Sequence, residues 1–247
     1  EFDESVLRKD ELTIRNLNLF FSVKANHVRN DSLNGWDINF DIEEAFYFYP
    51  ILYASGFRSQ FQLELGFNHI NFRGHGESIG ALYKFYDRHS FSFFYNANRH
   101  KNGKTGHDFS MTKYSTVEPL YFTDTTSEFN FDNYNVSLGG HYWITPRIKA
   151  GLGGMYMYEM YKQLDTGAFD LGSSEFFFHK YQIRTFLDYN NINYHYEFQE
   201  GFRNYTYGET IQTIDYPEIS FFKFTNDVYY YAMIGERGNF AVHNRIG

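Results

Sequence analysis

Charged side chains alternate with apolar ones along several segments of this sequence. Glu64 lies between Leu63 and Leu65, and Lys84 lies between Tyr83 and Phe85. Successive side chains of a β-strand point to opposite faces, so such charges share one face. Mixed charges on one wetted face can line a path that selects solutes by size and charge. The candidate pore-lining residues are Lys24, Asp37, Asp41, Glu43, Glu64, Lys84, Lys149, Glu159, Arg184, Asp188, His195, Glu197 and Arg245.

The same charges have a simpler interpretation, which is pairing across neighbouring strands on a solvated face. For any single residue of the set this is the more economical explanation. The mixture of signs argues against a dedicated anion path. Because the chain carries 30 acidic and 22 basic side chains, we expect a mild preference for cations.

Two short motifs resemble parts of barrel enzymes but are incomplete. The run His100-Lys101-Asn102-Gly103 resembles the His-x-Ser-Asn-Gly motif of outer-membrane phospholipases and deacylases, but the serine nucleophile is missing. Asp87-Arg88-His89 has the Asp-x-His spacing of omptin proteases, but no Asp-x-Asp partner accompanies it. We therefore expect no catalytic residues, with a barrel enzyme of the lipase or deacylase type as an alternative.

Metal and cofactor chemistry has little support in the sequence. There is no cysteine, and the ten histidines are scattered, with no pair two residues apart. We expect no metal site and no cofactor. His100 and His107 are candidates for a protonation-sensitive gate, because histidine titrates near neutral pH. Exposed loop histidines without a role are the simpler interpretation.

Period-two alternation, rather than helical periodicity, dominates the chain and predicts β-strands. In the segment 16–26, Leu17, Leu19 and Phe21 alternate with polar residues. Twelve strands are predicted, or eleven if 218–234 forms one long strand. The predicted strands are 16–26, 36–42, 60–68, 79–85, 91–97, 134–142, 149–160, 181–189, 192–199, 218–224, 228–234 and 240–246.

Aromatic residues make up 22% of a chain whose mean hydropathy is −0.53. Rings on one face of each strand and polar residues on the other explain both values. No stretch approaches the ~18 apolar residues of a membrane helix, and the net charge of −8 disfavours nucleic acid as a partner. The regular alternation and the ring-rich apolar face favour a lipid-embedded β-barrel over a soluble β-protein.

The lengths of the predicted connections favour the same architecture. Short connections are predicted at 86–89, 144–147 and 188–191, and long ones at 100–128, 163–174 and 201–216. Short turns on one side and long loops on the other are typical of outer-membrane barrels. The long segment from His100 to Glu128 is the first candidate for a loop that partly occludes the pore.

Several segments resemble the monomeric outer-membrane porin G family. They are Ala81–Phe93, the hairpin Trp143–Lys149, and Met155–Tyr161 followed by Leu164–Gly167. The segment Gly201–Tyr205 also resembles the family but contributes little to the comparison. The resemblance implies a monomeric, sugar-permeable, transmembrane up-and-down barrel of fourteen strands. The porins for oligogalacturonate and sialic acid, with twelve strands, are near neighbours. No histidine role is carried over to this chain.

The sequence thus predicts an all-β chain, 1–247, that forms a single transmembrane barrel domain of about twelve strands in the bacterial outer membrane. Expected partners are membrane lipid, lipopolysaccharide and small hydrophilic solutes, chiefly mono- to oligosaccharides that diffuse passively through a monomer. A non-conducting structural or export-complex barrel is a further alternative. It would be favoured by rings that plug the polar face, for which the candidates are Phe20, Phe94, Trp143 and Phe186.

Overall fold

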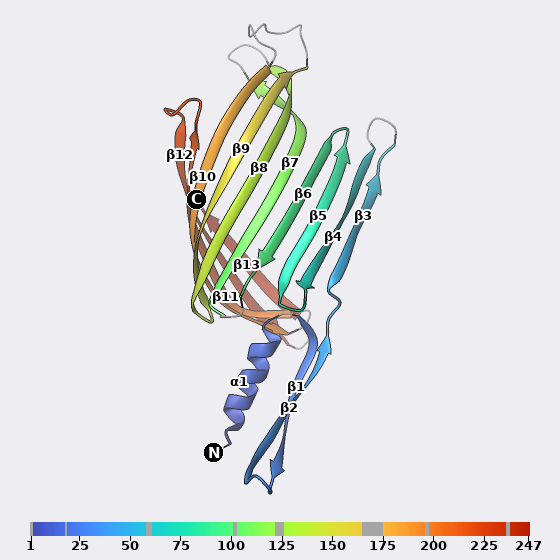
Figure 1. Cartoon of the computed structure of the whole chain (residues 1–247), viewed down its shortest axis with the longest axis vertical. Coiled ribbons are helices and arrows are strands. Elements are labelled where there is room, and N and C mark those ends of the chain that lie inside the picture. Colours follow the sequence, from blue (N-terminus) through green and yellow to red (C-terminus); the bar gives the residue numbers. More distant parts are fainter. Residues whose placement is uncertain are drawn as a thin grey trace.

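The computed structural model describes residues 2–17, 19–57, 61–100, 103–121, 126–164, 175–195, 198–235 and 238–247. Thirteen strands and one helix form in these ranges (Figure 1). They are α1 (Glu4–Arg15), β1 (Phe20–Asn30), β2 (Gly35–Glu44), β3 (Phe48–Ser55), β4 (Gln62–Phe72), β5 (Glu77–Tyr86), β6 (His89–Ala97), β7 (Thr105–Tyr121), β8 (Thr126–Thr145), β9 (Ile148–Gln163), β10 (Glu175–His195), β11 (Phe198–Thr213), β12 (Ser220–Ile234) and β13 (Gly238–Ile246).

Strands β3 to β13 form one antiparallel sheet in which each strand pairs with its sequence neighbours. This is the up-and-down order, and the sheet curves like the wall of a barrel (Figure 1). β3 and β13 are its two edges, and they do not pair with each other. The predicted fold class, an all-β up-and-down sheet of the membrane-barrel type, is confirmed, with eleven strands in the sheet.

Three parts of the predicted strand pattern were wrong. The expected loop 100–128 is largely β7, and the expected loop 201–216 is largely β11. The expected turn at 188–191 lies inside β10, where Asn190 and Asn191 pair with β11. Of the two alternatives for 218–234, the single long strand is confirmed, as β12. Asn, Ser and Thr favour turns in isolation, but on a sheet their backbone groups join the strand ladder instead.

The missed strand β7 also overturns the predicted alternation of short and long connections. Because every strand reverses direction, the two-residue turn at 87–88 lies at the same end of the sheet as the C-terminal ends of β7 and β9. The two-residue turn at 146–147 lies at the other end. Short turns therefore occur at both ends of the sheet, and connection length does not separate them.

An α-helix, which the sequence analysis did not predict, and a two-stranded hairpin, which the predicted strand list placed in the barrel wall, form a separate unit. β1 pairs with β2 alone, and α1 packs on β1, below the sheet in Figure 1. Asp3 caps the helix by accepting a hydrogen bond from the Ser5 amide at 2.8 Å. Leu7, Val23 and Ala25 are buried in the core of this unit.

Asn16, which follows α1, connects the unit to the end of β10. Its side-chain oxygen accepts a hydrogen bond from the Tyr194 amide at 3.2 Å, and its side-chain nitrogen donates to Asn193 at 3.3 Å. Glu11 holds the helix on the hairpin from inside the unit. Its carboxylate accepts hydrogen bonds from the Ala25 amide at 3.2 Å and from Arg8 and Arg15.

The Glu11 contacts predict how the α1–β1–β2 unit responds to pH. Burial raises the pKa of Glu11, but the Ala25 amide and the two guanidiniums lower it by more, so the pKa lies below 4.5. A lowered folded-state pKa means that the stabilisation is present above pH 4.5 and is lost as pH falls through the folded value. We expect Glu11→Gln to destabilise the unit by about 1–2 kcal/mol at pH 7.

Hydrogen exchange of the Ala25 amide measures this loss directly, because Glu11 accepts its hydrogen bond. Glu4→Gln is the matched control, since Glu4 is half exposed and also pairs with Arg8. The interpretation is wrong if Glu11→Gln exchanges at the wild-type rate, or if the protection factor of the wild-type amide, which is its intrinsic exchange rate divided by the observed rate, does not fall below pH 4.5.

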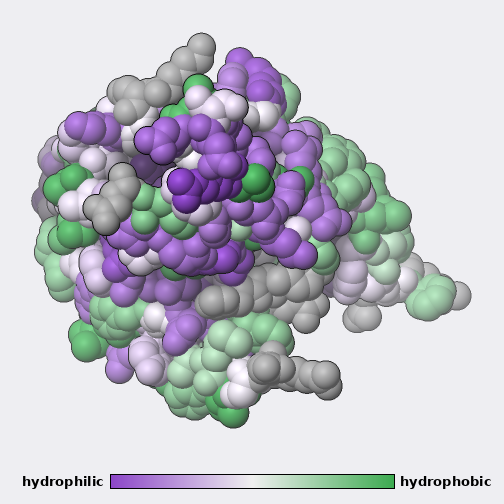
Figure 2. Space-filling view, turned by 90° about the horizontal axis from the view of Figure 1, so that it is seen from below, coloured by the Kyte–Doolittle hydropathy of each residue, from purple (hydrophilic) through white to green (hydrophobic). Residues whose placement is uncertain are grey.

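The two faces of the large sheet differ in chemistry. On β10, Ile183 and Leu187 are 50% and 49% exposed on the convex face, whereas Gln182 and Asp188 are 5% and 2% exposed on the concave face. The convex residues belong to an apolar band that also includes Leu65, Phe91, Met111, Val136, Leu138, Leu152 and Phe222. Seen from below, hydrophobic residues gather toward the outside and hydrophilic residues cover the middle (Figure 2).

The convex band is interrupted between β11 and β12, where three polar side chains bond to one another. Asn226 donates to Thr206 at 2.6 Å, and Asn204 donates to Asn226 at 3.3 Å. Polar groups that satisfy each other in this way can be tolerated in an apolar environment. Among the described residues, no helix is long and apolar enough to cross a membrane.

Candidate site on the concave face

Four carboxylates on the concave face are almost fully buried, and each is held by a basic side chain. Asp188 accepts two hydrogen bonds from Arg203, from Nε at 2.8 Å and from Nη2 at 2.9 Å, and Lys149 lies 3.5 Å away. The two parallel N–H donors form the bidentate arrangement that binds a carboxylate most strongly. Three adjacent strands, β9 to β11, supply this cluster.

Glu209, on β11, forms the second cluster. It accepts hydrogen bonds from Arg184 at 2.9 and 3.0 Å and from Gln182 at 2.5 Å. Lys223, on β12, lies 3.7 Å from its other oxygen. The register explains the cluster, because Arg184 and Lys223 are the residues paired with Glu209 on its two neighbouring strands.

Two further clusters extend the pattern. Asp227 on β12 binds Arg245 of β13 at 2.6 Å and also contacts His243 at 2.9 Å. Glu159 on β9 accepts a hydrogen bond from Lys180 of β10 at 2.6 Å. Buried acids therefore lie on four adjacent strands, β9 to β12.

The acids and the bases of these clusters differ strongly in exposure. The Glu209 side chain is 6% exposed while that of Arg184 is 46% exposed, and Asp227 is 3% exposed against 60% for Arg245. The carboxylates lie against the strands and the basic groups extend beyond them. The concave surface near these clusters is consequently basic, although the whole chain has a net charge of −8.

Aromatic rings on the concave face lie over glycines. A Cβ on Gly151 would collide with the Phe186 ring, and a Cβ on Gly80 would come within 2.5 Å of the Phe94 ring. Trp143 donates a hydrogen bond to the Asn98 carbonyl at 3.0 Å, and the Arg99 guanidinium lies 3.9 Å from its ring centroid. Three of the four predicted plugging rings thus lie on this face, while Phe20 lies on β1 of the separate hairpin.

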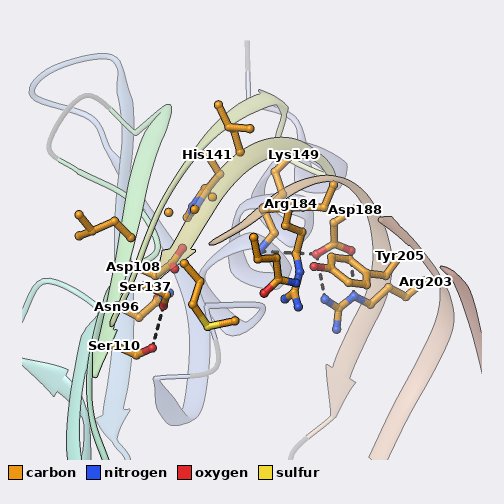
Figure 3. A pocket seen from close by; sticks show the side chains of 18 residues that line it. Asn96, Asp108, Ser110, Ser137, His141, Lys149, Arg184, Asp188, Arg203 and Tyr205 are labelled. Carbon is orange, nitrogen blue, oxygen red and sulfur yellow. Dashed lines mark hydrogen bonds and ion pairs between the residues drawn. The ribbon is translucent and has the colours of Figure 1, made fainter. Parts of the chain in front are cut away.

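A cavity of about 470 Å³ opens between these groups on β6 to β11. Figure 3 shows Arg184 and Arg203 on one side and Asp108, Ser110, Ser137 and Asn96 on the other. Its volume lies within the range of small-molecule sites, ~300–1,000 Å³. The lining combines basic groups, the two acids Asp108 and Asp188, and hydroxyl groups.

The structure distributes the predicted pore-lining residues over three places. Seven lie on the concave face of the large sheet: Glu64, Lys84, Lys149, Glu159, Arg184, Asp188 and Arg245. Four lie on the separate hairpin, outside that sheet: Lys24, Asp37, Asp41 and Glu43. They alternate as a wall strand would, but β1 and β2 pair only with each other, as in the register pair Lys24–Asp41 and the 2.6 Å hydrogen bond from Asn26 to Asp41. His195 ends β10, and Glu197 lies outside the described residues.

Sequence reasoning missed Asp108, Gln182, Arg203, Glu209, Lys223 and Asp227. On β11 the usual signal is inverted. Tyr205 and Tyr207 share the concave face with Arg203 and Glu209, and the convex face carries Asn204, Thr206 and Gly208. Aromatic and small polar residues do alternate at 202–210. On this strand, however, the aromatic residues Tyr205 and Tyr207 lie on the concave face and not on the convex face.

The motifs weighed for enzyme or metal chemistry do not assemble into a site in the described residues. Asp87 and Arg88 form the turn between β5 and β6, and Lys101 and Asn102 lie outside the described residues. His100 and His107 stack with a nitrogen–nitrogen distance of 2.8 Å. Among the described residues, no three His, Asp or Glu side chains are grouped as metal ligands.

Comparison with known proteins identifies a fold without identifying a family. No protein-family model and no curated protein matches the sequence. Among solved structures, the chain is similar to BamA from Haemophilus ducreyi lacking POTRA domains 1–3, with a TM-score of 0.55 and 15% identity. The match covers 98% of this chain and 50% of that one, so the chain spans half the length of that structure. The likeness supports the fold of an outer-membrane β-barrel protein, whereas membership of the porin G family stays a prediction.

Proposed function

We propose that this chain forms wall strands of a bacterial outer-membrane β-barrel whose concave face lines a hydrated interior. The observation that carries the proposal is the two-sided sheet: an exposed apolar band on the convex face, and buried acids with extended basic groups on the concave face. Water-soluble β-sheets bury their apolar face instead. Membrane lipid and lipopolysaccharide are the expected surroundings of the convex band.

Strand length supports this location. A strand that crosses a bilayer at about 45° needs ~9–11 residues. β4, β5 and β6 have 11, 10 and 9 residues, which is enough to cross once. β7 to β11 have 16 to 21 residues, so part of each would project beyond the membrane.

For the role of the barrel, we propose a non-conducting subunit of an export or structural complex. The α1–β1–β2 unit supports this role, because it extends beyond one end of the sheet and offers a surface outside the membrane. The rings of Phe94, Phe186 and Trp143 lie on the concave face, as an interior filled by side chains requires. No catalytic role is proposed.

A second candidate is the passive diffusion of mono- to oligosaccharides through a monomer. The hydrated concave face and its cavity favour it. If the barrel conducts, the extended basic groups favour anions over cations, which is the reverse of the preference expected from net charge. Reversal potentials across a planar bilayer would measure that preference.

Two measurements on the full protein separate these roles. We expect no swelling of liposomes in glucose or raffinose above the protein-free rate, and we expect native-gel migration of detergent-extracted outer membranes well above the size of the single chain. Sugar-dependent swelling would overturn the non-conducting role. Migration at the size of the single chain would overturn the complex.

A further inference from the structure

One row of paired residues crosses the cavity from an acid to an arginine. Asp108 of β7 pairs with Gly139 of β8, Gly139 pairs with Gly153 of β9, and Gly153 pairs with Arg184 of β10. Three strand spacings separate the ends of the row, which is about 14 Å between Cα atoms. The two residues between the charged ends are glycines, which have no side chain to fill the cavity.

Gly153 differs from the other glycines on this part of the face. Gly151 lies under Phe186, Gly106 under His141, and Gly139 under the Asp108 carboxylate. A Cβ on Gly153 would approach only the backbone of β8, with the Leu138 carbonyl at 3.3 Å. The space above Gly153 is therefore not filled by a neighbouring side chain, and it forms the floor of the cavity.

The basic side of the cavity has guanidinium N–H groups that donate no hydrogen bond within the described residues. Arg184 and Arg203 each use Nε and Nη2 on a buried carboxylate. Within the described residues, no hydrogen bond of either Nη1 is observed. Each carboxylate fixes its guanidinium in place, and Arg184 and Arg203 line the cavity together with Lys149 (Figure 3).

The opposite side of the cavity carries an acid that takes part in none of the ion pairs found among the described residues. Asp108 lines the cavity beside Asn96 and the hydrogen-bonded pair Ser110 and Ser137, whose oxygens are 2.8 Å apart. Arg184 is turned toward Glu209, on the far side from Asp108. The two opposite charges therefore do not satisfy each other directly.

We propose that this cavity binds a small zwitterionic solute. Its acidic group, a carboxylate or a phosphate, would bind the free Nη1 groups of Arg184 and Arg203, since guanidinium N–H groups match such anions. Its ammonium group would bind Asp108. The site concerns the concave face itself, so it is independent of whether the barrel conducts. Because the cavity opens on the face opposite the apolar band, the ligand is a dissolved molecule and not a membrane lipid.

Binding of three related probes to the detergent-solubilised full protein tests the proposal. The probes are 6-aminohexanoate, hexanoate and hexylamine, which share a six-carbon chain but carry both charges, only the negative charge or only the positive charge, and calorimetry measures the affinity. We expect 6-aminohexanoate to bind at least threefold more tightly than either of the others, about 0.65 kcal/mol. Equal binding of 6-aminohexanoate and hexanoate, or no binding of any probe, would overturn the proposal.

Variants assign the two ends of the ligand. Arg184→Gln should weaken both 6-aminohexanoate and hexanoate about tenfold, whereas Asp108→Asn should remove only the preference for the zwitterion. Arg245→Gln is the control, because it removes a similar cation from a buried carboxylate on the same face but outside the cavity. An equal loss in Arg245→Gln, or an unchanged preference in Asp108→Asn, would contradict the assignment.

The floor of the cavity offers a second pair of variants. Gly153→Leu should abolish binding by filling the space above the floor, and Gly154→Leu places the same side chain on the other face of β9. Heat-modifiable migration on a gel verifies that both variants fold. Binding by a folded Gly153→Leu variant at wild-type affinity would overturn the site.

Discussion

Replacing Leu138 by arginine is expected to destabilise the membrane-inserted protein by about 2–4 kcal/mol. Leu138 is 63% exposed on the convex face of β8. It lies seven residues before the strand ends at Thr145, or about 16 Å along the barrel axis at a 45° tilt. That depth places it well inside a lipid-facing band, where an arginine must leave water or distort the bilayer. On a water-exposed surface the same change would alter stability by less than about 0.5 kcal/mol.

Urea titration of the protein in lipid vesicles, followed by tryptophan fluorescence, measures this difference. Leu33→Arg is the matched control, because Leu33 is 76% exposed in the turn between β1 and β2, outside the large sheet. We expect the control to change stability by less than about 0.5 kcal/mol. A Leu138→Arg variant as stable as the control would contradict a lipid-facing convex surface.

Replacing Asp188 by asparagine is the second change with a large expected effect, a loss of about 2–3 kcal/mol. The substitution keeps the shape of the side chain but removes the charge that holds both Arg203 and Lys149. Two like charges would then face each other across the lost acid. The expected loss is smaller than that of a fully buried pair, because the side chains of Arg203 and Lys149 are 35% and 21% exposed.

The same urea titration measures the effect of Asp188→Asn. Asp31→Asn is the control, since Asp31 pairs with Arg29 at 3.0 Å but is 88% exposed. Exposed ion pairs contribute little, so we expect this variant to differ from wild type by less than about 0.5 kcal/mol. Comparable losses in the two variants would mean that burial does not distinguish the ion pairs.

Local alternation was sufficient to predict the strands that bury one face in a regular way. β4, β5, β6 and β9 lie close to the predicted ranges, and the charged members of their polar faces lie on the concave side of the sheet. A side-chain period of two directly records which face a residue occupies. Seven of the candidate lining residues could therefore be placed on one face without coordinates.

The alternation of polar and apolar residues did not predict the structure correctly where the neighbouring strand decides it. Asp188 to Asn191 resemble a turn, yet they continue β10 because each backbone group meets a partner on β11. Asp37 and Asp41 alternate like wall residues, yet β2 pairs only with β1. The helix α1 had a local signal in the capping residue Asp3 and the four-residue spacing of Glu4–Arg8 and Glu11–Arg15. A search centred on period two does not detect it.

The sequence by itself determined the two-sided character of the strands, since hydrophobic periodicity is a property of neighbouring residues. Only the tertiary structure decided which acids are buried and which bases extend into the interior. Asp188 is held by residues from two other strands, and Glu209 by residues from β10 and β12. Strand register sets these contacts through backbone hydrogen bonds across the sheet, and a one-residue slip would place every partner on the opposite face.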